Sequence, residues 1–195
     1  MLRTLVRLAT PLLIATPLAA QTPPHQAAVL AGGCFWGVQN LFEHVRGVTR
    51  VTSGFSGDSA WHAESVRIEY DPAVVSYGTL LNIFFTVAHD PTSLDRQGPD
   101  VGPEYRSAIF FANESQHRTA QAVMDSLARA QLWPNRIVTR LTPLTGFFVA
   151  PPEHQDYALA HPTDPYIVIN DEPKVARLRT RFPDLFRAEP TRFNP

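Results

Sequence analysis

The fold is decided by residues 27–45, AAVLAGGCFWGVQNLFEHV, where an apolar run meets two glycines and then a helical pattern. Residues 27–31 are all apolar, which is typical of a strand buried on both faces, and Gly32-Gly33 indicates a tight turn. From Cys34 to Val45 apolar side chains recur every three or four residues, which predicts an amphipathic helix. This strand-turn-helix unit places the single cysteine of the chain in the first helical turn.

Three more strands and one more helix are predicted after this unit. Alternating apolar residues predict strands, and helical spacing predicts one more helix between them. In chain order these are strands at 48–55 and 65–70, a helix at 77–85 and a strand at 107–111. The resulting order β-α-β-β-α-β predicts an α+β fold, a ferredoxin-like (split βαβ) two-layer sandwich.

The second half of the chain is predicted to embellish this sandwich. Asn113, followed three residues later by Gln116, is typical of a capping box at the start of a further helix. Residues 136–141 and 146–149 are predicted to be added strands of a mixed sheet. An irregular C-terminal extension is expected after them.

Composition excludes several classes of function. Seventeen Lys and Arg balance eighteen Asp and Glu, for a formal net charge of −1, so the basic surface that nucleic-acid binding needs is missing. A hydrophobic share of 44% favours one globular domain. With a single cysteine, neither an intramolecular disulfide nor a multi-thiolate zinc site can form, and the seven histidines show no paired ligand spacing. No metal site is expected.

The first twenty residues read as a targeting segment. Two arginines precede a mostly apolar stretch that ends at Ala19-Ala20, as in a secretory signal peptide. The stretch is too short and too interrupted by proline for a membrane span. We therefore expect a signal peptide at 1–20 and a catalytic domain at 21–195, exported to the periplasm or secreted, with no membrane span in the mature chain.

Cys34 is the strongest candidate for chemistry. At a helix N-terminus, unpaired N–H groups and the helix dipole favour the thiolate, which is the nucleophilic form of cysteine. Phe35 and Trp36 would form an apolar wall beside the sulfur. The alternative is an inert cysteine buried among core aromatics.

A second candidate group comes from carboxylates and a phenol. Glu64 stands at the start of a strand near aromatic residues, where burial can raise its pKa until it acts as a general acid. Asp100 and Tyr105 belong to a loop rich in Gly and Pro, a usual place for functional residues. The alternative for each is an ordinary solvated side chain.

Four motifs together resemble the peptide methionine sulfoxide reductase A family. They are Gly-Cys-Phe-Trp-Gly at 33–37, His-Ala-Glu at 62–64, the loop 96–109 (RQGPD and YRSAI) and His-Gln-Asp-Tyr at 154–157. The resemblance runs from about residue 27 to the region of His154. The tail at 165–186 is similar to extensions of some bacterial members.

The resemblance implies an enzyme that repairs oxidised methionine, a peptide-methionine (S)-S-oxide reductase. Cys34 would attack the sulfoxide sulfur as a thiolate, and Glu64 would protonate the oxygen. Methionine would leave, and Cys34 would remain as a sulfenic acid. One enzyme type serves each sulfoxide epimer, and the S epimer is implied here.

The resemblance also implies the binding groups. Asp100 and Tyr105 match family positions that form hydrogen bonds near the sulfoxide oxygen. Phe35 and Trp36 would hold the terminal methyl group of the substrate. Because the segment between Gly57 and His62 is short, a tyrosine that many members place there has no counterpart, and Trp61 or a water would fill the gap.

Regeneration requires an outside thiol. Many members carry further cysteines that resolve the sulfenic acid, whereas this chain has none. We expect no bound cofactor, and a reductant that is a thioredoxin-like protein, a glutaredoxin with glutathione, or a small thiol. The expected oligomeric state is a monomer.

Two other classes of function remain open at this point. A cysteine hydrolase or acyltransferase would need a histidine base such as His62 or His154, and would leave Glu64 unexplained. A non-catalytic binder of oxidised or hydrophobic peptides, or an inactive relative, would use Phe35 and Trp36 alone.

Overall fold

The computed structural model describes residues 26–57 and 62–193. The strands of its sheets are β1 (Gln26–Gly32), β2 (Val48–Ser56), β3 (Ala63–Tyr70), β4 (Arg96–Gln97), β5 (Asp100–Val101), β6 (Ser107–Phe111), β7 (Arg140–Pro143) and β8 (Phe147–Val149). Its α-helices are α1 (Phe35–Glu43), α2 (Tyr77–Ile83), α3 (Glu114–Ala130), α4 (Tyr157–Ala160) and α5 (Glu172–Arg181). Four single-turn helices join them: η1 (Phe84–Ala88), η2 (Pro103–Tyr105), η3 (Pro152–His154) and η4 (Ile167–Asp171).

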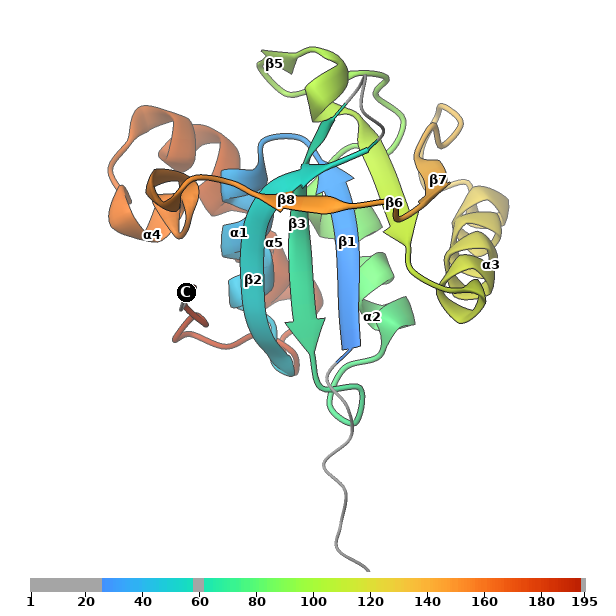
Figure 1. The fold of residues 1–195 in the computed structure, drawn as a ribbon, viewed down its shortest axis with the longest axis horizontal. Helices are drawn as coiled ribbons and strands as arrows, with labels where there is room; N and C mark the ends of the chain where they lie inside the picture. The colour runs from blue at the N-terminus through green and yellow to red at the C-terminus, as the bar shows by residue number, and fades with distance from the viewer. Residues whose placement is uncertain (1–25, 58–61, 194–195) are drawn as a thin grey trace, which may run out of the picture.

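Within these residues the main sheet has six strands in the order β7-β6-β1-β3-β2-β8. All neighbours are antiparallel except β6 and β7, which are parallel, so the sheet is mixed. β1 is central, with Leu30 opposite Val66 on one side and Ile109 on the other. β8 crosses the front of the other strands, while α1 and α5 lie behind them (Figure 1).

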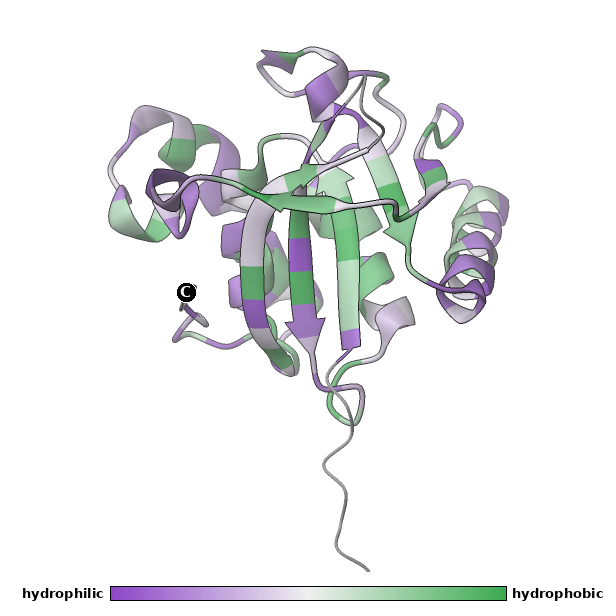
Figure 2. Cartoon of the chain, viewed as in Figure 1, coloured by the Kyte–Doolittle hydropathy of each residue, from purple (hydrophilic) through white to green (hydrophobic). Residues whose placement is uncertain are grey.

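The core lies mainly between the sheet and the helices. α1 contributes Val38, Leu41 and Phe42, which are almost completely buried. Successive residues of β1 face opposite sides: Leu30 joins the main core, whereas Val29 belongs to a smaller apolar cluster on the other face. Both clusters contain β1 residues, which explains why this strand is hydrophobic after its first residue, Gln26 (Figure 2).

Most predicted elements are confirmed, and so is the mixed α+β class. The four strands of the predicted sandwich and both helices between them lie where the periodicity placed them. Asn113 caps α3, since its side chain accepts a hydrogen bond of 3.0 Å from the Gln116 N–H. The expected signal peptide at 1–20 lies outside the described residues. No helix in 26–57 or 62–193 is long and apolar enough to cross a membrane.

Two expectations about the second half were wrong. The strand expected at 136–141 is β7 at 140–143, because the Val138 N–H donates to the Pro91 carbonyl (2.8 Å) and so ties this stretch to the loop 89–104. The C-terminal extension is helical rather than irregular. Its helices are fixed by apolar anchors, since Ile167 and Leu178 are completely buried.

Candidate active site

Cys34 caps the N-terminus of α1 directly after the end of β1. The turn requires Gly33, whose φ is +90° and whose absent Cβ would lie 2.7 Å from the Gln97 side chain. Cys34 is only 8% exposed, and the Trp36 backbone N–H donates a hydrogen bond to its sulfur. The sulfur therefore faces the helix N-terminus, as the sequence predicts.

The protonation state of Cys34 differs from the expectation. Burial, and secondly the negative charge of Glu64, raise the pKa of the thiol to about 12. The hydrogen bond from the Trp36 N–H favours the thiolate but is outweighed. The free enzyme thus favours the neutral thiol at physiological pH, and the helix terminus, which was expected to favour the thiolate, does not decide the balance.

Alkylation of the free enzyme checks this protonation state. We expect the rate of Cys34 alkylation by iodoacetamide to rise about tenfold per pH unit from pH 6 to pH 10 without levelling, since only the thiolate reacts. Pseudo-first-order rates by mass spectrometry would measure it. A plateau below pH 8 would mean that the thiolate already dominates in the resting enzyme.

Glu64 lies beside the cysteine at the same helix terminus. It is near the start of β3, and its Oε2 accepts a hydrogen bond of 3.0 Å from the backbone N–H of Phe35. Burial raises the pKa of the Glu64 carboxyl to about 7; the Phe35 hydrogen bond opposes this rise, and Asp100 adds to it. A carboxyl with this pKa can both give and take a proton near neutrality.

The loop 89–104 brings Asp100 and Tyr105 to this pair. Asp100 begins β5 and Tyr105 ends η2, and buried Gln97 holds the loop through reciprocal hydrogen bonds with the Asp90 backbone (2.8 and 3.0 Å). Burial, and next the charges of Glu64 and Asp100, raise the pKa of Tyr105 to about 12. Its hydroxyl is therefore a proton donor that stays protonated.

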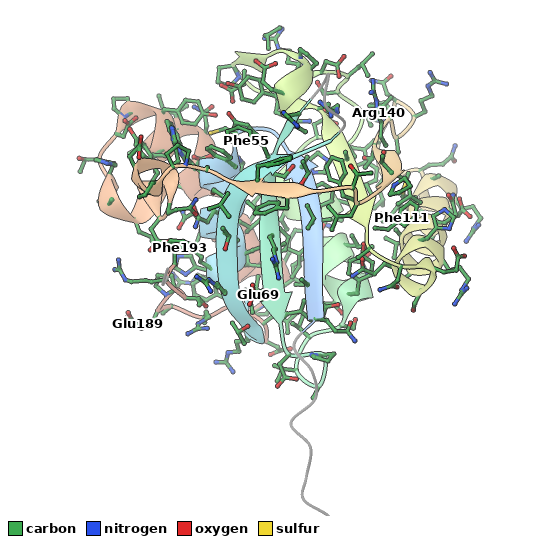
Figure 3. All side chains as sticks on the ribbon, viewed as in Figure 1. Phe55, Glu69, Phe111, Arg140, Glu189 and Phe193 are labelled. Atoms are coloured by element: carbon green, nitrogen blue, oxygen red, sulfur yellow. The ribbon has the colours of Figure 1, made fainter. Side chains whose placement is uncertain are left out.

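Phe35 and Trp36 form an aromatic wall at the start of α1. The Phe35 ring packs edge-on against Phe55, with centroids 5.5 Å apart; Phe55 lies on the upper part of β2 (Figure 3). Trp36 stacks on Tyr157 with centroids 3.7 Å apart, and its indole N–H donates to Nδ1 of His154 (3.3 Å). Both rings are therefore held in place by aromatic contacts, and Trp36 also by its hydrogen bond.

The motif at 154–157 is a support for that wall. Gln155 is buried: its amide accepts from the Ser53 N–H (2.9 Å) and donates to the Ser53 and Ala150 carbonyls (2.9 and 3.0 Å). This anchor fixes its neighbours His154 and Tyr157 against Trp36. The residues of this motif thus have a packing role and take no part in proton transfer.

Residues that sequence reasoning missed come from the C-terminal extension. The Tyr166 hydroxyl donates to the Asp100 carboxylate and is in hydrogen-bonding contact with Cys34. Asp171 is completely buried, pairs with Lys174 (2.9 Å), and lies so close to Gly37 that a Cβ there would be 1.9 Å from its Oδ1. No local pattern marks Tyr166, because it lies 132 residues along the chain from Cys34.

A cavity of about 360 Å³ opens beside the sulfur. Its lining includes Cys34, Asp100, Tyr166, Asn170 and Lys174. This opening gives a ligand access to a cysteine that is otherwise buried.

The site has no histidine base for the cysteine. Within 26–57 and 62–193 the hydrogen-bond partners of Cys34 are Trp36 and Tyr166. His154 is bonded to Trp36, and His62 is exposed with its ring beside Phe148. In the same part of the chain no three His, Cys, Asp or Glu side chains gather as metal ligands would. Trp61, which was expected to fill the oxygen site, lies outside the described residues.

In the described part of the chain a buried cysteine lies beside a carboxyl of raised pKa and no histidine is bonded to it, an arrangement that fits a cysteine-dependent redox enzyme better than a hydrolase. Known proteins agree. Residues 26–185 match the family described as peptide methionine sulfoxide reductase, to which the chain belongs.

Relatives and solved structures with this name cover most of the chain. MsrA 2 of Mesorhizobium japonicum is 47% identical over 86% of this chain and 93% of its own, and MsrA of Thermus thermophilus is 44% identical over 84% and 99%. Methionine sulfoxide reductase A of Corynebacterium diphtheriae superposes with a TM-score of 0.66 at 30% identity, over 74% of this chain and 78% of its own. Yeast Mxr1 in reduced form gives 0.67 at 25% identity, over 72% and 87%. The enzyme therefore reduces methionine sulfoxide in peptides.

Proposed function

We propose that Cys34 is the nucleophile and Glu64 the proton carrier in the reduction of the S epimer of peptide methionine sulfoxide. The observation that carries this assignment is their placement together at the N-terminus of α1. In the net step the sulfoxide S–O bond breaks and a S–O bond forms on Cys34. Two electrons pass from the cysteine sulfur to the substrate sulfur, and the thiol proton ends on the oxygen of the sulfenic acid.

The raised pKa values explain how the proton travels. Below pH 7 the pair holds two protons, and between about pH 7 and 12 it holds one, on the sulfur. A bound sulfoxide places a partly positive sulfur beside the thiol, which favours the thiolate electrostatically. Glu64 then takes the thiol proton and gives it to the sulfoxide oxygen. Tyr105 donates a hydrogen bond to that oxygen, and Asp100 accepts the hydrogen bond of the Tyr166 hydroxyl beside it.

Phe35 and Trp36 take the methyl group of the substrate. Their rings are the apolar surfaces adjacent to Cys34, and Phe55, Tyr157 and His154 keep them in place. A fixed apolar wall lowers the entropy cost of holding a small group.

The reductant is an outside thiol, for which we propose a thioredoxin-like protein or a glutaredoxin with glutathione. The thiol displaces water from the sulfenic acid to give a mixed disulfide, and a second thiol releases Cys34 by exchange. Yeast Mxr1, whose fold is similar, forms a complex with Trx2. The cavity beside Cys34 supports access for such a thiol.

We further propose that the enzyme acts as an exported monomer after loss of residues 1–20. The support is the pattern of two arginines, an apolar stretch and Ala19-Ala20. For the domain at 21–195 we propose a ferredoxin-like centre, which the antiparallel order β6-β1-β3-β2 supports.

Epimer-resolved turnover tests the proposed function. Residues 21–195 and the full chain are each given a peptide with either methionine sulfoxide epimer, with thioredoxin, with glutaredoxin and glutathione, or with dithiothreitol. We expect reduction of the S epimer alone with at least one protein reductant. Reduction of the R epimer would contradict the proposal. So would a failure to reduce either epimer with dithiothreitol as reductant.

A further inference from the structure

The C-terminal extension brings a phenol to the reacting sulfur. The Tyr166 hydroxyl contacts Cys34 on one side and the Asp100 carboxylate on the other. Glu64 and Tyr105 lie near the same two groups, since the charge of Asp100 raises the pKa of both, and Cys34 interacts electrostatically with each. Cys34, Asp100 and Tyr166 line one cavity, so the Tyr166 hydroxyl is at the place where a ligand meets the sulfur.

The tyrosine is held there from several directions. Its ring meets the Trp36 ring edge-on, with centroids 6.1 Å apart at 89°. Its backbone N–H donates to Oδ1 of Asp164 (2.8 Å), and the next residue, Ile167, is completely buried. On the other side of η4, Asp171 is locked against Gly37 of α1. A side chain fixed in this way loses little entropy when it binds a ligand.

We propose that Tyr166 is a catalytic residue that donates a hydrogen bond to the sulfoxide oxygen, and that the C-terminal extension thereby completes the active site. This rests on the proposed function. Tyr105 and Tyr166 are both phenols whose pKa is raised by Cys34 and by Asp100, so the two hydroxyls lie near the same sulfur. Tyr166 reaches the same reacting group from the opposite end of the chain.

The proton of the hydroxyl has a definite route. A phenol has one proton to donate, and in the structure it is directed at the Asp100 carboxylate. A sulfoxide oxygen gains negative charge as Cys34 attacks, and this charge makes it a competing acceptor for the proton. Rotation about the C–O bond of Tyr166 then directs the proton to that oxygen, with Tyr105 as a second donor.

Kinetics of Tyr166→Phe test the assignment, with Tyr70→Phe as matched control. Tyr70 ends β3, at the opposite end of that strand from Glu64, and its hydroxyl donates to Gln26 (2.9 Å). Loss of one donor to a developing oxyanion slows a reaction about 10²-fold or more. We expect Tyr166→Phe to lose about 10²-fold in kcat/KM and Tyr70→Phe to stay near the parental value.

Two further measurements distinguish an effect of Tyr166 on the sulfoxide oxygen from an effect on the Cys34 sulfur. If Tyr166 acted only on Cys34, alkylation by iodoacetamide and sulfoxide reduction would fall by the same factor; we expect reduction to fall much further. In the Cys34→Ser background, which cannot turn over, adding Tyr166→Phe should weaken binding of a methionine sulfoxide peptide and leave binding of the unoxidised peptide unchanged.

The outcomes are distinguishable from failure of the proposed function. If the parental enzyme reduces no sulfoxide, the proposed function fails. Suppose that the parental enzyme does reduce sulfoxide. The role of Tyr166 is then overturned if Tyr166→Phe reduces sulfoxide at the parental rate, or if it lowers sulfoxide reduction and Cys34 alkylation by the same factor.

Discussion

A single turnover without reductant is expected to release one methionine per enzyme molecule and to leave Cys34 as a sulfenic acid. The reason is that the chain has one cysteine, so no second thiol can condense with the oxidised sulfur. Dimedone should trap the intermediate, and mass spectrometry should place the adduct on Cys34. In peroxide the same residue should proceed to sulfinic acid, because nothing within the chain protects it.

Cys34→Ser is the control for this experiment, and its activity should be lost completely. Glutathione added after the single turnover should give a mixed disulfide at Cys34, which a glutaredoxin or thioredoxin-like protein then clears. Release of methionine in stoichiometric amounts while Cys34 stays a free thiol would move the redox chemistry elsewhere. The sequence offers no second cysteine for it.

Glu64→Gln is expected to slow the reduction step by roughly 10²–10⁴-fold, the usual contribution of a positioned general acid. Glutamine keeps the shape of the side chain and can still accept the Phe35 N–H, but it cannot carry a proton to the oxygen. Alkylation of Cys34 should be unchanged or faster, because the Glu64 charge is one cause of the raised thiol pKa. Reduction at the parental rate would remove Glu64 from the mechanism.

Glu64 and Cys34 together determine how kcat/KM is expected to depend on pH. The productive enzyme holds one proton on the two groups, and with a Glu64 pKa of about 7 and a Cys34 pKa of about 12 this state dominates above pH 7. Since kcat/KM reports the free enzyme, it should fall about tenfold per pH unit below pH 7 and be level above it. In Glu64→Gln this fall below pH 7 should disappear.

Sequence alone determined most of the framework and the candidates for the reacting groups. The strand-turn-helix unit around Cys34 is defined by local rules, because a glycine turn and a helical stripe need no distant partner to be recognised. The sequence predicts Cys34, Glu64, Asp100 and Tyr105 as site residues, and in the fold the first three act electrostatically on the fourth. The missing resolving cysteine is likewise a property of composition.

Tertiary structure decided the protonation state of the thiol and the last member of the site. The pKa of Cys34 depends on how deeply the folded chain buries it and on the charge of Glu64, 30 residues away. A helix N-terminus favours the thiolate locally, but desolvation is a property of the whole fold and outweighs it. Tyr166 reaches the sulfur because Asp171 docks on Gly37 and Ile167 enters the core. Such long-range packing leaves no periodic signal along the sequence, which is why the extension that looked irregular turned out to line the active site.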